Sequence, residues 1–282
     1  MSAGVEETEA VLSPEELAHR EWAQERLTAV TGAHGPLALV DFHEVSGRER
    51  VIDLPMSAEP GPDGQGVLIV PDEGAQIDID GTPVTEPTVL SLLRGDGTPL
   101  LTCGGTVVDA FSLDGDSVEL RIYRAENEQA QRFAGIEVYP FDPELVVRGE
   151  FRPYSQATDV TWGFSRESDD GHDKKVPGVV EVEVGGKRYD LVAFLDHGLL
   201  VIVFADGTTG RESHAPGRFL KLSGVTGAGP VKVDFNQAFI PPCGFSDYFN
   251  CPLPPAENRI EAPVRGGEKH VLWADETDGH RD

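Results

Sequence analysis

Residues 179–204 read VVEVEVGGKRYDLVAFLDHGLLVIVF, and this stretch decides the fold class. The runs 179–184 and 189–194 flank Gly185-Gly186, a pair typical of a tight β-hairpin because glycine readily adopts the positive φ angles that such turns need. The run 199–204 is apolar throughout, which predicts a strand covered on both faces. The stretch therefore predicts consecutive strands of an antiparallel sheet.

The residues before this stretch repeat the same signals. Short apolar runs separated by turn residues occupy 37–42, 51–54, 67–70, 77–79, 89–93, 106–111 and 118–123. Asp80-Gly81 is a hairpin turn signal, and no glycine-rich dinucleotide fingerprint follows a strand. We predict a mainly β protein with two antiparallel units: a sandwich-like unit over 33–125, then a barrel or half-barrel over 126–265.

The ends of the chain carry different signals. Ser13-Pro14-Glu15-Glu16 combines a capping serine, a proline suited to the first turn and a glutamate that completes a capping box, which predicts a helix over 13–32. Residues 1–12 are expected to be disordered, and 266–282 are expected to form a loose tail. The polar run 165–175 is expected to be a solvated loop.

Charge and composition restrict the partners. The 282 residues include 23 basic and 49 acidic side chains, a net charge of -26. This balance argues against nucleic acid or an anionic membrane as a partner, because both need a basic surface. With no leader peptide pattern and no apolar run of about 18 residues, we expect a cytoplasmic protein. The sequence predicts no particular cofactor or oligomeric state.

Polar residues crowd between 206 and 259, directly after the apolar run. Carboxylates, amides and arginines at strand ends suit a polar or anionic ligand. The prolines of a strap over residues 241–255 fix the backbone, so the strap could form the wall of a pocket. The candidate ligand-binding residues are Asp206, Glu212, Arg218, Asn236, Asn258 and Arg259.

Two of the three cysteines, Cys243 and Cys251, lie eight positions apart on the strap. They fit two buried free thiols, a disulfide, or two ligands of a metal completed by His214 or Asp247. Structural zinc sites place such cysteines about two to four residues apart, so we assign no metal. A catalytic thiol would need a base such as His214 nearby, and the sequence does not place one there.

The same region resembles the domain-of-unknown-function 1684 family of bacteria and archaea, from Trp22 to about Lys269. The resemblance rests on Gly217-Arg218-Phe219-Leu220, Asp234-Phe235-Asn236, Pro241-Pro242-Cys243 and CPLPPAENR at residues 251–259, together with Glu21-Trp22 and Glu25-Arg26. Ser213-His214 stands where the family usually has Thr-Tyr. The resemblance implies a map of site residues and no reaction.

Several functions remain open at this point. The first is binding of a small polar or anionic ligand in the C-terminal β unit. The alternatives are a hydrolase or transferase that uses Glu212, His214 or Cys243, a set of motif residues that only holds the fold together, and a split barrel that binds flavin. Whether the protein is an enzyme is left undecided.

Overall fold

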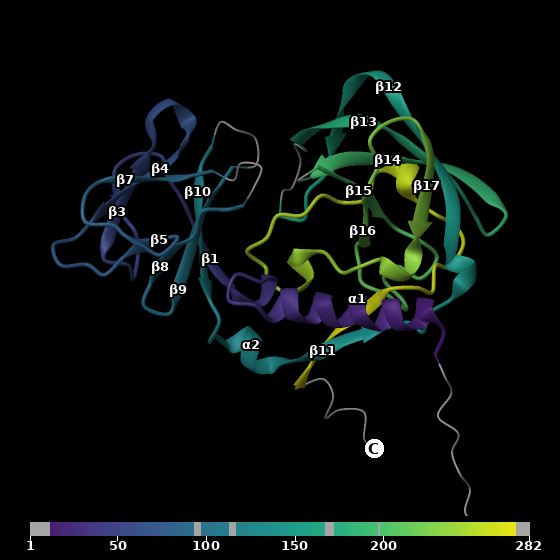
Figure 1. Cartoon of the computed structure of the whole chain (residues 1–282), viewed down its shortest axis with the longest axis horizontal. Coiled ribbons are helices and arrows are strands. Elements are labelled where there is room, and N and C mark those ends of the chain that lie inside the picture. Colours follow the sequence, from purple (N-terminus) through teal and green to yellow (C-terminus); the bar gives the residue numbers. More distant parts are fainter. Residues whose placement is uncertain (1–11, 93–96, 113–116, 167–171, 197, 275–282) are drawn as a thin grey trace, which may run out of the picture.

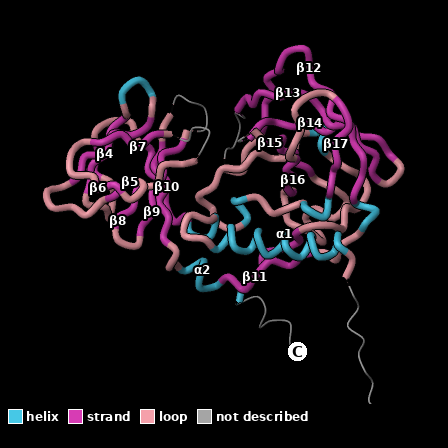
Figure 2. The backbone as a smooth tube through the Cα atoms, viewed as in Figure 1, coloured by secondary structure: helices cyan, strands magenta, loops and turns pink. Residues whose placement is uncertain are grey.

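The computed structural model describes residues 12–92, 97–112, 117–166, 172–196 and 198–274. The chain is mainly β, and Figure 2 shows strands dominating both ends of the molecule. The strands are β1 Leu39–Glu44, β2 Glu49–Arg50, β3 Met56–Pro60, β4 Gly66–Pro71, β5 Asp78–Ile79, β6 Thr82–Pro83, β7 Thr88–Ser91, β8 Leu101–Cys103, β9 Thr106–Phe111, β10 Glu119–Arg124, β11 Phe133–Val138, β12 Val146–Trp162, β13 His172–Val184, β14 Lys187–Asp196, β15 Leu199–Phe204, β16 Arg218–Leu222, β17 Gly229–Asp234 and β18 Glu268–Trp273.

The long helix α1 spans Pro14–Thr31 and begins as the sequence predicted. Glu16 donates its backbone N–H to Ser13 Oγ at 3.1 Å, and the Glu16 carboxylate accepts from the Ser13 backbone at 2.7 Å. This capping box satisfies two of the backbone donors that a helix start leaves unpaired. Figure 1 shows α1 lying beneath the second group of strands, near β11 and β18. A short helix, α2 (Glu128–Arg132), leads into β11.

The first group of strands forms two antiparallel sheets that share one core. One sheet has the order β1-β10-β9-β8-β5-β6 and the other β2-β3-β4-β7. Side chains from both sheets, such as Met56, Ile69 and Val108, are fully buried in one cluster. Asp80 and Gly81 turn the chain between β5 and β6 with φ angles of 50° and 77°. Two sheets closed over one core make the predicted sandwich-like arrangement.

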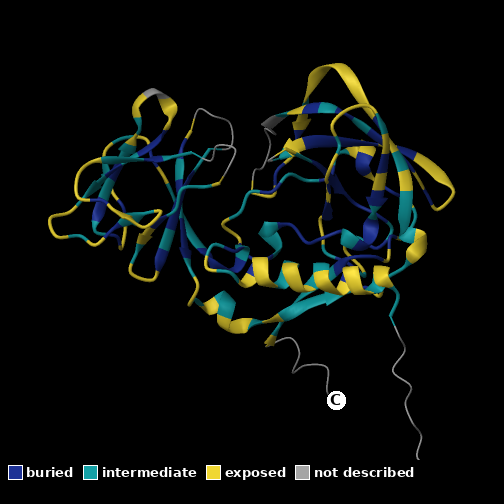
Figure 3. Ribbon diagram, viewed as in Figure 1, coloured by how far each residue is buried: buried dark blue, intermediate teal, exposed yellow. Residues whose placement is uncertain are grey.

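The second group is a six-stranded antiparallel sheet in the order β16-β15-β14-β13-β12-β17, curved into a half-barrel. The Gly185-Gly186 hairpin joins β13 to β14 with both glycines at positive φ, 59° and 76°. β15 pairs on both sides and is buried for nearly its full length, as its apolar run predicted. Leu191, Ile202 and Val233 lie in its inner core, and Figure 3 shows this buried centre beneath more exposed outer strands.

The proline-rich strap over residues 241–255 crosses the opposite face of this sheet. Cys251 accepts a backbone hydrogen bond from Ser165 at 2.9 Å, and Leu253 donates one to Gly163 at 2.8 Å. The strap also reaches the first group of strands, because Ser246 Oγ donates to the Leu39 carbonyl at 2.8 Å. The rigid segment therefore closes a second apolar cluster and links the two groups of strands.

Two expectations about loops need correction. The polar run expected as a loop over 165–175 already belongs to β13 from His172, where Trp162 pairs with His172 at the far end of β12. The tail expected from residue 266 contains β18, which pairs with β11. Backbone pairing with a distant partner explains both corrections, because polar residues can also pair in a sheet when a neighbouring strand offers its backbone hydrogen-bonding groups.

The segments expected to be disordered or loose at the two ends of the chain, residues 1–12 and 275–282, lie almost entirely outside the described residues. Within the described residues, no helix has the length and apolar character to cross a membrane.

Candidate functional site

Arg218 and Asp206 form a salt bridge in the interior of the protein. Asp206 follows the end of β15, and Arg218 is the first residue of β16, so the turn between the strands brings them together. Arg218 Nη2 lies 2.9 Å from Asp206 Oδ2, and both side chains are 0% exposed. Arg218 also donates to the carbonyls of Val264 at 2.7 Å, Gly266 at 2.5 Å and Glu268 at 3.1 Å. The two terminal nitrogens of the guanidinium are thus occupied by protein acceptors and fix the segment that leads into β18, whereas Arg218 Nε is buried without a hydrogen-bond partner.

The second oxygen of Asp206 organises the turn between the two strands. Asp206 Oδ1 accepts from the backbone N–H and the hydroxyl of Thr208, both at 2.7 Å, and from the Val264 N–H at 3.1 Å. Thr208 Oγ1 in turn lies 2.8 Å from Ser213 Oγ. Thr208 and Ser213 are buried and were not among the predicted site residues. The sequence pattern that could have predicted them is the run DGTTGRES, because hydroxyl side chains commonly stabilise tight turns.

The two predicted asparagines hold separate parts of the backbone. Asn236 exchanges two hydrogen bonds with the backbone of Asp142, both at 2.9 Å. Asn258 accepts from the Val192 N–H at 2.7 Å and donates to the carbonyls of Val192 at 2.9 Å and Val203 at 2.8 Å. Both side chains are buried. Each therefore replaces missing backbone partners beside the sheet.

Glu212 and Arg259 lie nearer the surface. Glu212 pairs with Arg265 through two hydrogen bonds of 2.7 and 2.8 Å, and the bond from Arg265 lowers the pKa of this carboxyl. Arg259 is exposed. Of the six predicted residues, only Asp206 and Arg218 bond to one another directly through their side chains among the described contacts. These residues are close in the sequence because they share turns, and this closeness does not reflect a single site on which all their side chains converge.

A second buried ion pair was missed by the sequence reasoning. Arg26 on α1 donates to Glu268 through Nε at 2.8 Å and Nη2 at 3.2 Å, and Glu268 is 1% exposed. The same carboxylate accepts from the Ile240 N–H at 2.7 Å. Arg26 belongs to the Glu25-Arg26 pair of the family resemblance, which was the available signal. The pair attaches α1 to β18.

The strap cysteines lie together with His214. Both are free thiols, with Cys251 buried and Cys243 partly exposed. The Cys243 backbone N–H donates to Cys251 Sγ at 3.3 Å. A hydrogen bond from Cys251, then the imidazole of His214, lowers the pKa of Cys243 to about 5. Hydrogen bonding to Cys243 and burial raise the pKa of Cys251. Among the described residues, no cluster of His, Cys, Asp or Glu side chains is arranged to hold a metal ion.

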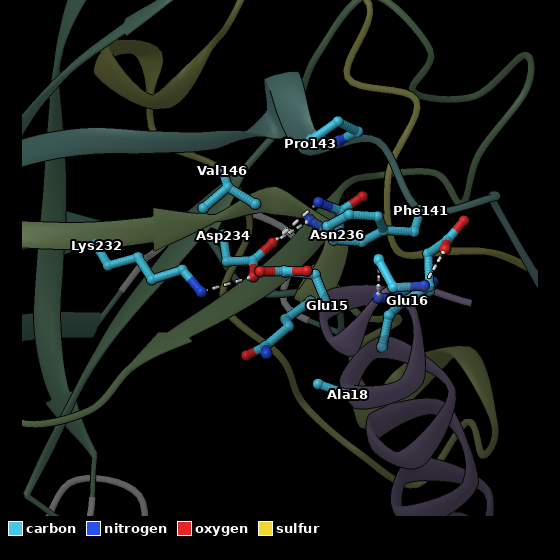
Figure 4. Close-up of a pocket in the computed structure, with 12 residues that line it drawn as sticks. Glu15, Glu16, Ala18, Phe141, Pro143, Val146, Lys232, Asp234 and Asn236 are labelled. Carbon is cyan, nitrogen blue, oxygen red and sulfur yellow. Dashed lines mark hydrogen bonds and ion pairs between the residues drawn. The ribbon is translucent and has the colours of Figure 1, made fainter. Parts of the chain in front are cut away.

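A pocket of about 580 Å³ opens between the first turn of α1 and the end of β17. Figure 4 shows Glu15 facing Asp234 and Lys232 across it, with Phe141 and Pro143 on another side. Asn236 is the predicted site residue that lines it. Asp234 accepts from Asn236 Nδ2 at 3.0 Å and from Lys232 at 3.4 Å.

His19 lies against the same pocket. Its ring stacks on Trp22 with the ring centroids 5.5 Å apart, and its Nε2 lies 3.3 Å from the Tyr139 carbonyl. The remaining ring nitrogen, Nδ1, is buried without a hydrogen-bond partner. Buried polar atoms are nearly always paired, so this nitrogen is a place where a bound molecule or water would be stabilised.

Comparison with known proteins identifies part of the chain. The family described as "Protein of unknown function (DUF1684)" matches residues 131–269. A solution NMR structure of an uncharacterized protein from Haloarcula marismortui is 29% identical, covers 49% of this chain and 77% of its own, and superposes with a TM-score of 0.41. No curated protein matches the chain. Residues 131–269, which include the half-barrel, the buried Asp206–Arg218 pair and the strap, are a domain of the DUF1684 family.

Proposed function

We propose that the protein binds a small, polar, amine-bearing molecule in the pocket between α1 and the end of β17. The observation that carries this proposal is a pocket of about 580 Å³ whose lining has three carboxylates, on Glu15, Glu16 and Asp234, against one amine, on Lys232. A cavity of this size falls in the range of about 300 to 1,000 Å³ that small molecules occupy. The excess of carboxylates favours an ammonium group over an anion.

The charge of the lining changes the expected class of ligand. The sequence suggested a polar or anionic ligand because arginines lie close to the motif, but Arg218 already bonds to four protein groups. Glu16 is also occupied, by the capping box. Glu15 is left facing the pocket, and Phe141 supplies an apolar wall against which a short carbon chain can pack.

A pair of probes of equal length and opposite charge tests the proposal. We expect 1,4-diaminobutane to raise the melting temperature and butanedioate to leave it unchanged. At about 100 times Kd, a ligand that binds only the folded state stabilises it by about 2.7 kcal/mol. Glu15→Gln should remove the effect, whereas Glu25→Gln, on an exposed part of the same helix, should keep it.

Two results would contradict this assignment. Stabilisation by the dicarboxylate alone would mean that the pocket prefers anions. No response to the diamine, or an equal response in the Glu15→Gln variant, would mean that Glu15 does not recognise an ammonium group.

Three of the buried motif residues, Asp206, Arg218 and Asn258, support a second proposal, that they hold the fold and do not contact a ligand. Their side chains are buried, and the hydrogen bonds described for them go to protein groups. A measurement of the free energy of unfolding of an Arg218→Met variant tests this role.

A further inference from the structure

Two thiols and an imidazole lie together where the strap crosses the outer face of the half-barrel. Cys243 sits in a short 3-10 helix, Pro242–Gly244, and its N–H points at Cys251 Sγ, 3.3 Å away. Each of the two thiols also shifts the pKa of the other, down for Cys243 and up for Cys251. The eight-residue separation along the chain is thus closed in space, and the two thiols are neighbours.

The imidazole of His214 is held beside this pair by the backbone. The His214 N–H donates to the Lys269 carbonyl at 2.8 Å. The ring packs directly on Gly244, because a Cβ added there would lie 2.9 Å from His214 Cε1. His214 Nε2 is buried and has no hydrogen-bond partner among the described contacts. The imidazole lies close enough to Cys243, the residue before Gly244, to lower the pKa of its thiol. Beside the thiols there is therefore a ring nitrogen, His214 Nε2, that can accept a proton and is not engaged in any described hydrogen bond.

The two thiols differ in access and in surroundings. Cys243 is partly exposed, and Cys251 is 5% exposed. The Ser165 hydroxyl accepts from the Cys251 N–H at 3.0 Å and lowers the pKa of the Cys243 thiol, and the positive charges of Arg121 and Lys174 interact with Cys251. These groups favour negative charge on sulfur in a chain that is otherwise strongly acidic. Cys243 is thus the thiol that meets a reagent first, and Cys251 is the thiol behind it.

We propose that Cys243 and Cys251 form a thiol–disulfide exchange site for low-molecular-weight disulfides. Cys243 is the attacking thiol, Cys251 is the resolving thiol, and His214 carries the proton of Cys251 to the second leaving thiolate. The site lies apart from the pocket at α1, whose lining includes none of these residues, so it does not depend on ligand binding there.

The exchange takes place in two steps. The Cys243 thiolate attacks one sulfur of the disulfide RSSR, which forms the Cys243–SR bond, breaks the RS–SR bond and releases RS⁻, which takes up a proton as RSH. Cys251 then gives its proton to His214 and attacks the Cys243 sulfur. This forms the Cys243–Cys251 bond, breaks the Cys243–SR bond and releases the second RS⁻, which His214 protonates. Two protein thiols are oxidised, and one disulfide is reduced to two thiols.

The environment of Cys251 suits the second step. Its pKa is raised first by the hydrogen bond with Cys243. Once Cys243 carries a neutral mixed disulfide, that contribution disappears, and Cys251 becomes easier to deprotonate. Cys251 therefore stays protonated until Cys243 has formed the mixed disulfide.

Acyl transfer by the same cysteine is less well supported. A tetrahedral intermediate needs free N–H donors close to the nucleophile. The Cys243 N–H is occupied by Cys251, the Gly244 N–H donates to Pro241 at 2.9 Å, and the Phe245 N–H donates to Pro242 at 3.0 Å. The backbone around Cys243 thus has no donor left for an oxyanion.

Intact-mass spectrometry of the full chain with glutathione disulfide tests the proposal. We expect the reduced wild type to become about 2 Da lighter, with the new bond mapped to Cys243 and Cys251. Cys251→Ser should stop at a single adduct of about 305 Da on Cys243. Cys103→Ser, which removes the third cysteine, should behave as the wild type.

The role of His214 has its own readout. In His214→Asn, the pH midpoint for alkylation of Cys243 by iodoacetamide should rise by about one unit, because the imidazole no longer stabilises the thiolate. The proposal is overturned if glutathione adds first to Cys103, if Cys243 stays unmodified, or if Cys251→Ser accumulates no adduct. An unchanged midpoint in His214→Asn would remove the histidine from the mechanism.

Discussion

Replacing Arg218 by methionine removes a buried cation and keeps a side chain of similar length. The variant leaves the Asp206 carboxylate without the partner that lies 2.9 Å away, in a place where both side chains are 0% exposed. Breaking a buried ion pair by removing one member typically costs about 3 to 5 kcal/mol. The carbonyls of Val264, Gly266 and Glu268 also lose their donor. An orphaned buried acceptor costs about 1 to 3 kcal/mol, less where water enters.

We therefore expect Arg218→Met to lower the free energy of unfolding by at least about 4 kcal/mol. In a chain of this size, that corresponds to a fall in melting temperature of about 8 to 16 °C. Urea unfolding followed by far-UV circular dichroism measures the loss directly. Arg259→Met is the matched control, because this arginine is exposed and its loss should change stability by less than about 0.5 kcal/mol.

A double variant separates the ion pair from simple loss of packing. Asp206→Asn keeps an oxygen that can accept from Thr208, so the combined variant no longer contains a buried, unpaired carboxylate. The two changes together should cost about 2 kcal/mol less than the sum of their separate costs. If Arg218→Met costs under about 1 kcal/mol, or if the two costs simply add, the pair does not stabilise the fold as argued.

Three other perturbations follow from the same contacts. Asn258→Ala should cost about 3 kcal/mol, since three buried backbone groups lose their partner, and exposed Glu257→Ala should be neutral; chemical denaturation compares the two. Glu268→Gln should lower the melting temperature and increase hydrogen exchange in α1, because the helix loses its buried carboxylate partner; unchanged exchange would contradict this attachment. Alkylation of Cys243 should stay fast as pH falls to about 5, because only the thiolate reacts and its pKa is about 5. Cys103, whose pKa burial raises, should already be slow at neutral pH, and a pH series of peptide mapping shows both.

Much of the fold was predictable because its signals are local. The Gly185-Gly186 and Asp80-Gly81 turns and the capping box at Ser13 each depend on residues within a few positions of one another. The pairing of β11 with β18 joins residues far apart in the chain, and nothing in either segment specifies the other. Strand pairing of this kind depends on tertiary context, which a sequence pattern does not contain.

The site was harder to predict for a different reason. Sequence reasoning predicted a ligand at Arg218 because a guanidinium suits carboxylate or phosphate groups. The structure shows this arginine in the interior against Asp206, and arginine is almost never fully buried unless it is paired. Asn236 and Asn258 lie on separate backbone segments despite their shared chemistry. The closeness of His214 to Cys243 also depends on how a turn and the strap lie relative to one another. The number of residues between them does not predict that arrangement.

The attachment of α1 to β18 means that the boundaries of the sequence family and of the cooperative folding unit differ. The family match begins at residue 131 and ends at 269, so it omits Arg26 and most of β18. A fragment cut at those limits would keep the Glu268 carboxylate without its arginine and would uncover Ile240 and Phe245, which pack with Val30 of the helix. Anyone who produces this domain for biophysical work should therefore start the chain before α1 and continue past Trp273.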